Sequence, residues 1–222
     1  VSAGLTSSWT RNSDGSGGNP ASVTDGLNTL IVQNGHTVTV DNGGNLDVKN
    51  LVIGQGTAGR LVIGANSTQQ QVVVRENLDV NAGASLSAGS AGAPSHLLRV
   101  YGNILNNGDI NLRPSPGVVV NTELFGAMVI AGANVPLFND VTFKSGSSAL
   151  TEVELNIDGS VTIEAGAAWS DGGFEHHVAG NWSVIGNGQF NATGTIVFDG
   201  MINTVNDNPS GALVAFHNLV FQ

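Results

Sequence analysis

The chain has 222 residues, enough for one large domain or two small ones with a substantial core. Its formal net charge is −10, from 7 Lys and Arg against 17 Asp and Glu, and this argues against nucleic acid or an anionic membrane as a partner, because phosphate binding needs clustered cations. The absence of Cys excludes disulfides and thiolate metal sites, and no stretch has the length and purity of a membrane-spanning helix.

Residues 1–29 lack strand alternation, and we predict that they form an N-terminal loop cap. The run from Asn12 to Pro20 is dense in turn-forming residues. Asp14 and nearby Asn oxygens could ligate calcium there, but the alternating carboxylates of calcium loops are missing, so we favour an ordinary loop and predict no cofactor. We expect Trp9 to pack over the open end of the structure that follows, because a first repeat otherwise exposes its core and strand edges.

Alternating apolar and polar residues begin at Leu30 and continue to residue 222, with 31 Gly in the chain to punctuate turns. Two stretches, 72–86 and 98–110, share a cadence in which an Asn precedes a short apolar strand and a Gly follows it. The cadence returns at 155–169 and 178–190. Asn77 and Asn103 are 26 residues apart, a length that fits one coil of a β-solenoid.

We therefore predict an all-β fold, a right-handed parallel β-helix (β-solenoid) over residues 30–222 with about eight to ten coils, continuing beyond residue 222. The right hand is the default for crossovers between parallel strands. A β-sandwich also shows short strands at regular spacing, but it has no reason to repeat the same cadence four times.

A longer period overlies the coils. The stretch Val48–Ile53 recurs as Phe138–Phe143 and as Phe216–Phe221, after steps of 90 and 78 residues. We expect the three copies to occupy matching places in a super-repeat of three to four coils. The chain would then end on the first strand of a further unit.

The segment from Trp9 to Ile63 resembles the start of many large secreted or surface proteins of the Bacteroidota. The resemblance is carried by Trp9, Pro20, residues 35–41 (GHTVTVD) and residues 50–53 (NLVI), and the pattern is also similar to the glycine-rich G8 domain. Later pieces, Phe198–Gly200 and Phe216–Leu219, resemble the repeating body of the same proteins. The resemblance implies export to the cell surface through a separate C-terminal signal, and a part in adhesion, gliding or surface assembly.

Parallel β-helices also carry polysaccharide lyases and hydrolases, which need two carboxylates facing one groove. Glu152 and Glu154 are two residues apart and are expected to share a strand face, with Asp158 and Glu164 in later strands. The outward polar face of alternating strands is the simpler explanation, so we predict no catalytic residues. His176 and His177 are adjacent, and in a strand they point to opposite faces, so we predict no metal site.

Carbohydrate modules often present a flat row of aromatic rings, for which Tyr101, Trp169 and Trp182 are candidates. Trp169 aligns with the apolar position of Phe190, and Trp182 aligns with Val161 and Leu78, which favours inward packing. The residues that could form a ligand or partner surface are Trp169 and Trp182, together with Leu219 and Phe221 of the apolar C-terminal strand.

The function that these patterns favour is a structural or adhesive solenoid segment of an exported cell-surface protein. Its expected partners are further coils or a second copy at the C-terminal end, and a surface polysaccharide. A carbohydrate-binding module is the first alternative, and a polysaccharide-active enzyme is the second.

Overall fold

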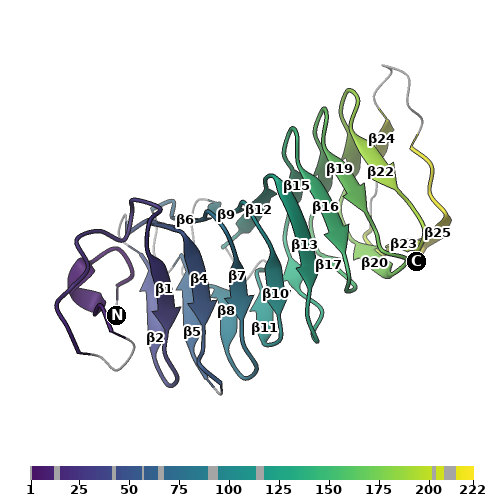
Figure 1. Cartoon of the computed structure of the whole chain (residues 1–222). Coiled ribbons are helices and arrows are strands. Elements are labelled where there is room, and N and C mark those ends of the chain that lie inside the picture. The colour runs from purple at the N-terminus through teal and green to yellow at the C-terminus, as the bar shows by residue number, and fades with distance from the viewer. Residues whose placement is uncertain are drawn as a thin grey trace.

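The computed structural model describes residues 2–12, 16–41, 44–56, 58–64, 68–89, 95–113, 118–201, 204–207 and 214–222. Its strands form three parallel sheets that run along the length of the molecule, with the N-terminal cap at one end and β25 at the other (Figure 1). From β1 to β24, successive strands go to successive sheets, so three strands and their corners make one coil, whereas β25 follows β24 in sequence and joins sheet II. The prediction of an all-β parallel solenoid is confirmed.

The strands are grouped here by sheet, in the order in which they pair. Sheet I contains β1 (Thr29–Val32), β4 (Asn50–Ile53), β7 (Leu78–Val80), β10 (Ile104–Asn106), β13 (Ala127–Ala131), β16 (Ser148–Thr151), β19 (Ala168–Ser170) and β22 (Gln189–Asn191). Sheet II contains β2 (Thr37–Val40), β5 (Arg60–Ile63), β8 (Ser85–Ala88), β11 (Asp109–Asn111), β14 (Leu137–Phe138), β17 (Asn156–Ile157), β20 (Glu175–Val178), β23 (Thr195–Phe198) and β25 (Asn218–Phe221). Sheet III contains β3 (Leu46–Val48), β6 (Gln71–Val74), β9 (His96–Val100), β12 (Val120–Leu124), β15 (Val141–Phe143), β18 (Val161–Ile163), β21 (Trp182–Val184) and β24 (Val205–Asp207).

Alternation along each strand builds the core. In β18, for example, Val161 and Ile163 are buried while Thr162 between them faces outward. Because the coils stack in register, inward side chains form rows along the axis. One row in sheet III runs through Val48, Val74, Val100, Leu124, Phe143, Ile163 and Val184.

Asparagine side chains connect neighbouring coils at the corner before sheet I. The N–H of Asn77 donates to Asn50 Oδ1 (3.0 Å), the N–H of Asn103 donates to Asn77 Oδ1 (3.3 Å), and the N–H of Val129 donates to Asn103 Oδ1 (2.8 Å). Backbone N–H groups need a partner when they leave a sheet ladder, and the amide oxygen of the coil below provides it. The expected repeat from Asn77 to Asn103 is thus confirmed, and its physical cause is this ladder.

The sequence repeats at 72–86 and 98–110 do not occupy the same part of the coil as the repeats at 155–169 and 178–190. The two pairs are shifted by one strand relative to each other. Asn77 precedes β7 in sheet I, whereas Asn181 precedes β21 in sheet III. Trp182 does pair with Val161, but Leu78 lies in a different sheet. The expected equivalence of Trp182 and Leu78 is therefore wrong, because the same Asn-led strand suits more than one corner of a coil.

The expected super-repeat is also wrong. Its three copies contain β4, β15 and β25, which belong to sheet I, sheet III and sheet II respectively. Copies of a true super-repeat would be whole coils apart and would share a sheet. An alternating strand led by Asn or Asp meets the needs of all three sheets, so a match of this kind does not fix the phase.

The N-terminal cap covers the first coil. A short 3₁₀ helix, η1 (Thr6–Ser8), is followed by Trp9, whose ring is buried against the core and whose Nε1–H donates to the Ala3 carbonyl (2.8 Å). Isolated parallel bridges join Ser2 to Thr39 and Thr24 to Asp47, so the cap also pairs with sheet II and sheet III. The predicted role of Trp9 is confirmed. Asp14, the candidate calcium ligand, lies outside the described residues.

Candidate functional site

Several outward carboxylates form ion pairs with basic side chains of neighbouring coils. Glu123 accepts from Arg99 (Nε to Oε2, 2.7 Å), and Glu164 pairs with Lys144. Burial alone would raise the pKa of Glu164, but the Lys144 ammonium and the Ser145 N–H and hydroxyl outweigh it and lower that pKa. A general acid needs a raised pKa, so the Glu164 carboxylate is suited to a structural ion pair.

The carboxylates proposed from sequence lie in three different corners of the coil, with Asp158 following β17 and Glu164 following β18. Glu152 and Glu154 lie in the corner between β16 and β17, so their expected place on a strand is wrong. Asp158 pairs with Arg113 (Nε to Oδ1, 3.2 Å). Within the described ranges, no group of three or more His, Cys, Asp or Glu side chains could hold a metal ion.

Asp79 is an acid that sequence reasoning missed. Burial raises its pKa. It faces outward from sheet I, and the residues aligned with it in the neighbouring coils are Val52 and Leu105. The sequence shows Asp79 as a single acid within an apolar strand. The pairing of that strand with its neighbours is needed to show that the aligned residues are apolar. The two aligned positions therefore provide no second carboxylate beside Asp79.

The two adjacent histidines face opposite sides, as predicted. His176 is fully buried, while His177 faces outward between Glu175 (Nε2 to Oε1, 3.3 Å) and Asp199 (Nδ1 to Oδ2, 3.1 Å). They cannot share a metal ion in this arrangement.

Trp169 and Trp182 belong to the core. Both side chains are 0% exposed, and their ring centroids are 5.5 Å apart. Trp169 also stacks on Phe143, and Trp182 packs edge-on against Phe216. Neither ring can contact a ligand at the surface, so the expectation that they form a ligand surface is corrected.

Tyr101 is the one aromatic of the three candidates that reaches the surface. Its ring stacks on Phe125 of the next coil, with centroids 4.4 Å apart and an interplanar angle of 8°. On the side of the preceding coil, the Arg75 guanidinium lies 5.1 Å from the Tyr101 centroid, and Asp47 holds that guanidinium (Nη2 to Oδ2, 2.5 Å). A sugar stacks on an open ring face, and both faces of Tyr101 have neighbours.

Tryptophan fluorescence provides a direct test of this packing. Trp9, Trp169 and Trp182 are all buried, so we expect blue-shifted emission and weak acrylamide quenching in the native chain. Soluble polysaccharides should leave both unchanged. Emission near that of free tryptophan, with efficient quenching, would contradict the buried aromatic core.

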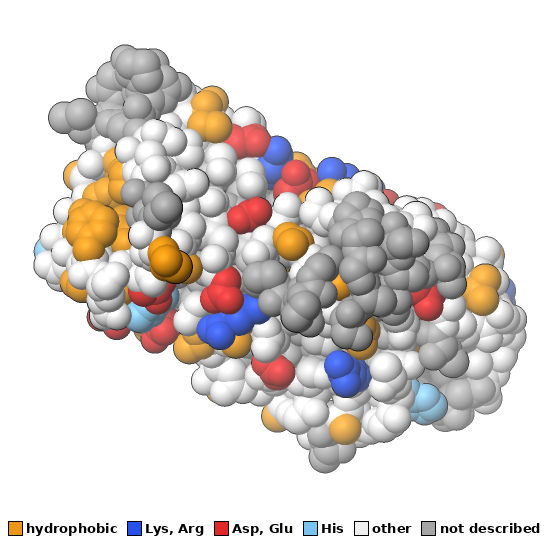
Figure 2. All heavy atoms as spheres, turned by 180° about the vertical axis from the view of Figure 1, so that it is seen from behind, with side chains coloured by type: hydrophobic (Ala, Val, Ile, Leu, Met, Phe, Trp, Pro, Cys, Tyr) orange, Lys and Arg blue, Asp and Glu red, His pale blue; other side chains and the backbone are white. Residues whose placement is uncertain are grey.

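The C-terminal end is the part of the described structure where core positions reach solvent. Leu219 and Phe221 are 40% and 64% exposed, yet the residues aligned with them in β23, Ile196 and Phe198, are each 1% exposed. The four side chains occupy the same inward rows, so the exposure arises because β25 is the last strand of this sheet among the described residues. Hydrophobic side chains gather at this end of the molecule (Figure 2, left).

All three sheets terminate at this end. β22, β25 and β24 are the last strands of sheet I, sheet II and sheet III, and each has a pairing partner on one side. The N-terminal end differs, because bridges from Ser2 and Thr24 join the cap to its strands. Among the described residues, β2 and β3 at the N-terminal end have partners in the cap, whereas β22, β24 and β25 each leave one edge of unpaired N–H and C=O groups beside apolar side chains; we call these three edges the open end.

No helix in the described residues is long and apolar enough to span a membrane. Compared with family models, curated proteins and solved structures, the chain matches none. The site with the best physical support is therefore the open C-terminal end, defined by the edges of β22, β24 and β25.

Proposed function

We propose that this chain is a structural or adhesive β-solenoid segment of an exported cell-surface protein, and that its open C-terminal end pairs with further β-structure. Partner strands at this end can come from further coils or from a second copy of the chain. In a solution of the 222-residue chain the occupant is a second copy. Each added coil would lengthen the stack by about 4.8 Å, the usual distance between strands.

The observation that carries the proposal is the contrast between aligned residues of β23 and β25. Phe198 is 1% exposed under β25, whereas Phe221 is 64% exposed on β25, the last described strand of the sheet. Covering Phe221 and Leu219 removes apolar surface from water and gives the backbone of β25 its missing partners. Export is supported by the resemblance of residues 35–41 and 50–53 to surface proteins.

The alternatives receive less support. A carbohydrate-binding module would need Trp169 or Trp182 at the surface, and both are buried. A polysaccharide-active enzyme would need two carboxylates in one groove, whereas Asp158 and Glu164 are held in separate ion pairs. A surface polysaccharide remains a proposed partner without a specific contact residue.

The proposal predicts concentration-dependent association through β25. The average mass of the native chain, measured by light scattering over a concentration series, should rise with concentration. The Val220→Lys variant should lower that mass without changing the melting temperature, because a charge on an edge strand disfavours pairing with another chain. Val220 is outward and 38% exposed, so it tolerates the charge.

The matched control is Ser87→Lys, at an outward position in the middle of the same sheet. This variant should associate as the native chain does. A strictly monomeric native chain at every concentration, or an equal loss of association in both variants, would contradict the proposal.

A further inference from the structure

Two buried histidines share an arrangement that the solenoid function does not explain. His96 in β9 and His176 in β20 are both 0% exposed. Nδ1 of His96 accepts a hydrogen bond from the backbone N–H of Gln70 (3.0 Å), and Nδ1 of His176 accepts one from the N–H of Leu155 (2.9 Å). In each case the donor is the aligned residue of the preceding coil. The imidazole thus takes the place of a backbone acceptor between two coils.

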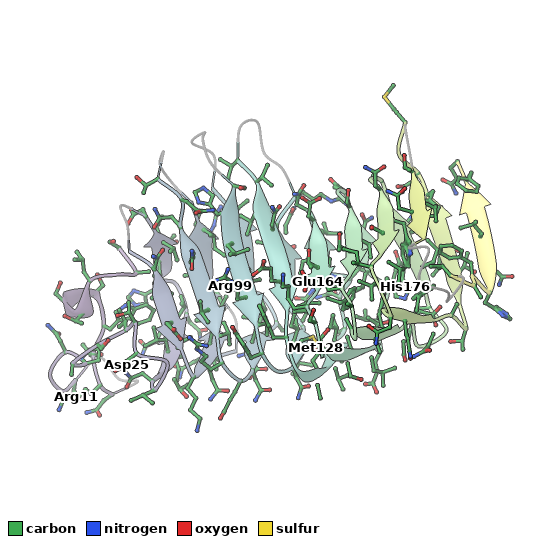
Figure 3. All side chains as sticks on the ribbon, turned by 90° about the horizontal axis from the view of Figure 1, so that it is seen from above. Arg11, Asp25, Arg99, Met128, Glu164 and His176 are labelled. Atoms are coloured by element: carbon green, nitrogen blue, oxygen red, sulfur yellow. The ribbon has the colours of Figure 1, made fainter. Side chains whose placement is uncertain are left out.

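The second ring nitrogen fixes the tautomer of His176. Because Nδ1 accepts, the proton of the neutral ring is on Nε2, and this Nε2–H donates to the Asp171 carbonyl (3.0 Å). Trp169 packs against the ring at 5.2 Å between centroids. His176 lies inside the stack, among the coils near the C-terminal end (Figure 3).

A second proton has no place in this arrangement. Protonated Nδ1 would point its hydrogen at the Leu155 N–H, so two donors would face each other and the backbone N–H would lose its acceptor. The same conflict arises between protonated His96 and the Gln70 N–H. Each coil boundary is therefore paired only while its histidine is neutral.

The charged groups around His176 do not remove this conflict. Burial lowers the pKa of His176, and nearby His177 adds to that effect, while the carbonyl and charge of Asp171 act in the opposite direction without reversing it. His177 is on the outer face with Glu175 and Asp199. For His96, burial is the cause that lowers the pKa.

Asp171 is already committed to other donors. Its carboxylate accepts from the N–H groups of Gly173, Thr193 and Gly194 and from the Thr193 hydroxyl. The corner therefore joins three coils, with His176 bonded to the preceding one and Asp171 bonded to the following one. Loss of the His176 contact releases one side of this corner.

We propose that His96 and His176 are acid-sensitive latches, and that protonation opens the boundary between β6 and β9 and the boundary between β17 and β20. Because the paired state excludes the proton, each latch contributes its full stability above the ordinary pKa of histidine, about 6.5, and loses it as the pH falls below that value. Mild acid thus loosens the stack at two defined places and frees strand edges there.

Amide hydrogen exchange, followed residue by residue by NMR between about pH 7.5 and pH 5, tests the proposal. After correction for intrinsic exchange, the protection factors of the Leu155 and Gln70 amides should fall by up to tenfold per pH unit below about pH 6.5, as expected for one linked proton. The Val161 amide, which donates to the Asn181 carbonyl (2.8 Å), is the internal control and should keep its protection.

The variant His176→Asn supplies an oxygen acceptor near the position of Nδ1 and does not titrate in this range. It should remove the pH dependence at Leu155 and leave it at Gln70, while His177→Asn should change neither. If His176→Asn does not fold, the ¹⁵N chemical shifts of the imidazoles in the native chain test the proposal instead. At neutral pH these shifts should show an unprotonated Nδ1 and a protonated Nε2. A Leu155 amide whose protection does not change with pH, or a native His176 protonated on Nδ1, would overturn the proposal.

Discussion

Replacing Ile163 with Asp should abolish cooperative unfolding at ordinary temperatures. Ile163 is fully buried in the inward row of sheet III, between Phe143 and Val184. An unpaired carboxylate there costs about 4 kcal/mol or more, against a total stability of about 5–15 kcal/mol for a typical domain. Urea unfolding followed by circular dichroism measures the loss.

The matched control is the neighbouring residue. Thr162 faces outward between Thr142 and Ser183, so Thr162→Asp should change the free energy of unfolding by about 0.5 kcal/mol or less. Equal unfolding midpoints for the two variants would mean that the assignment of inward and outward faces is wrong.

Removing the Asp171 carboxylate should have the next largest effect. Burial alone would raise the pKa of Asp171, but hydrogen bonds from Thr193, Gly194 and Gly173 outweigh it and lower that pKa. The carboxylate is therefore ionised, and both of its oxygens accept hydrogen bonds. In Asp171→Ala the three backbone N–H groups lose their acceptor, at about 1–3 kcal/mol for each that stays unsatisfied. We expect a total loss of about 3–5 kcal/mol, measured as a shift of the urea midpoint.

The effect of Asp171→Ala also has a predicted pH dependence. A lowered carboxylate pKa contributes stability that is present above the ordinary Asp value of about 4 and is lost as the pH falls through the folded-state pKa. The difference between native and variant should therefore shrink in acid. Asp109→Ala, at an exposed position of β11, is the control and should change stability by about 0.5 kcal/mol or less. An equally small effect at Asp171 would contradict its role as the acceptor at this corner.

The fold was predictable because two local signals agree with the global structure. Alternation identifies the inward residues, and the Asn cadence identifies corners, since Asn77 and Asn103 form one ladder. The phase between distant coils was not predictable in the same way. Coils differ in length, and an Asn-led strand occurs before sheet I at Asn77 and before sheet III at Asn181.

The candidate site was predictable only in part. The apolar character of Leu219 and Phe221 is visible in the sequence, but their exposure depends on the position of β25 as the last described strand of sheet II. The roles of His96 and Asp171 depend on which residues of neighbouring coils lie beside them. Such contacts span about one coil length in sequence, so no local pattern reports them.

Hydrogen exchange of β25, measured by mass spectrometry at low and high protein concentration, shows whether a second copy of the chain pairs with the C-terminal end. We expect peptides covering β7 and β10, which are paired on both sides, to stay protected at both concentrations. Peptides covering β25 should exchange quickly in the dilute chain and become protected in the concentrated one, as a second copy covers the open end. A β25 that is fully protected in a strictly monomeric sample would contradict the claim that this end is open.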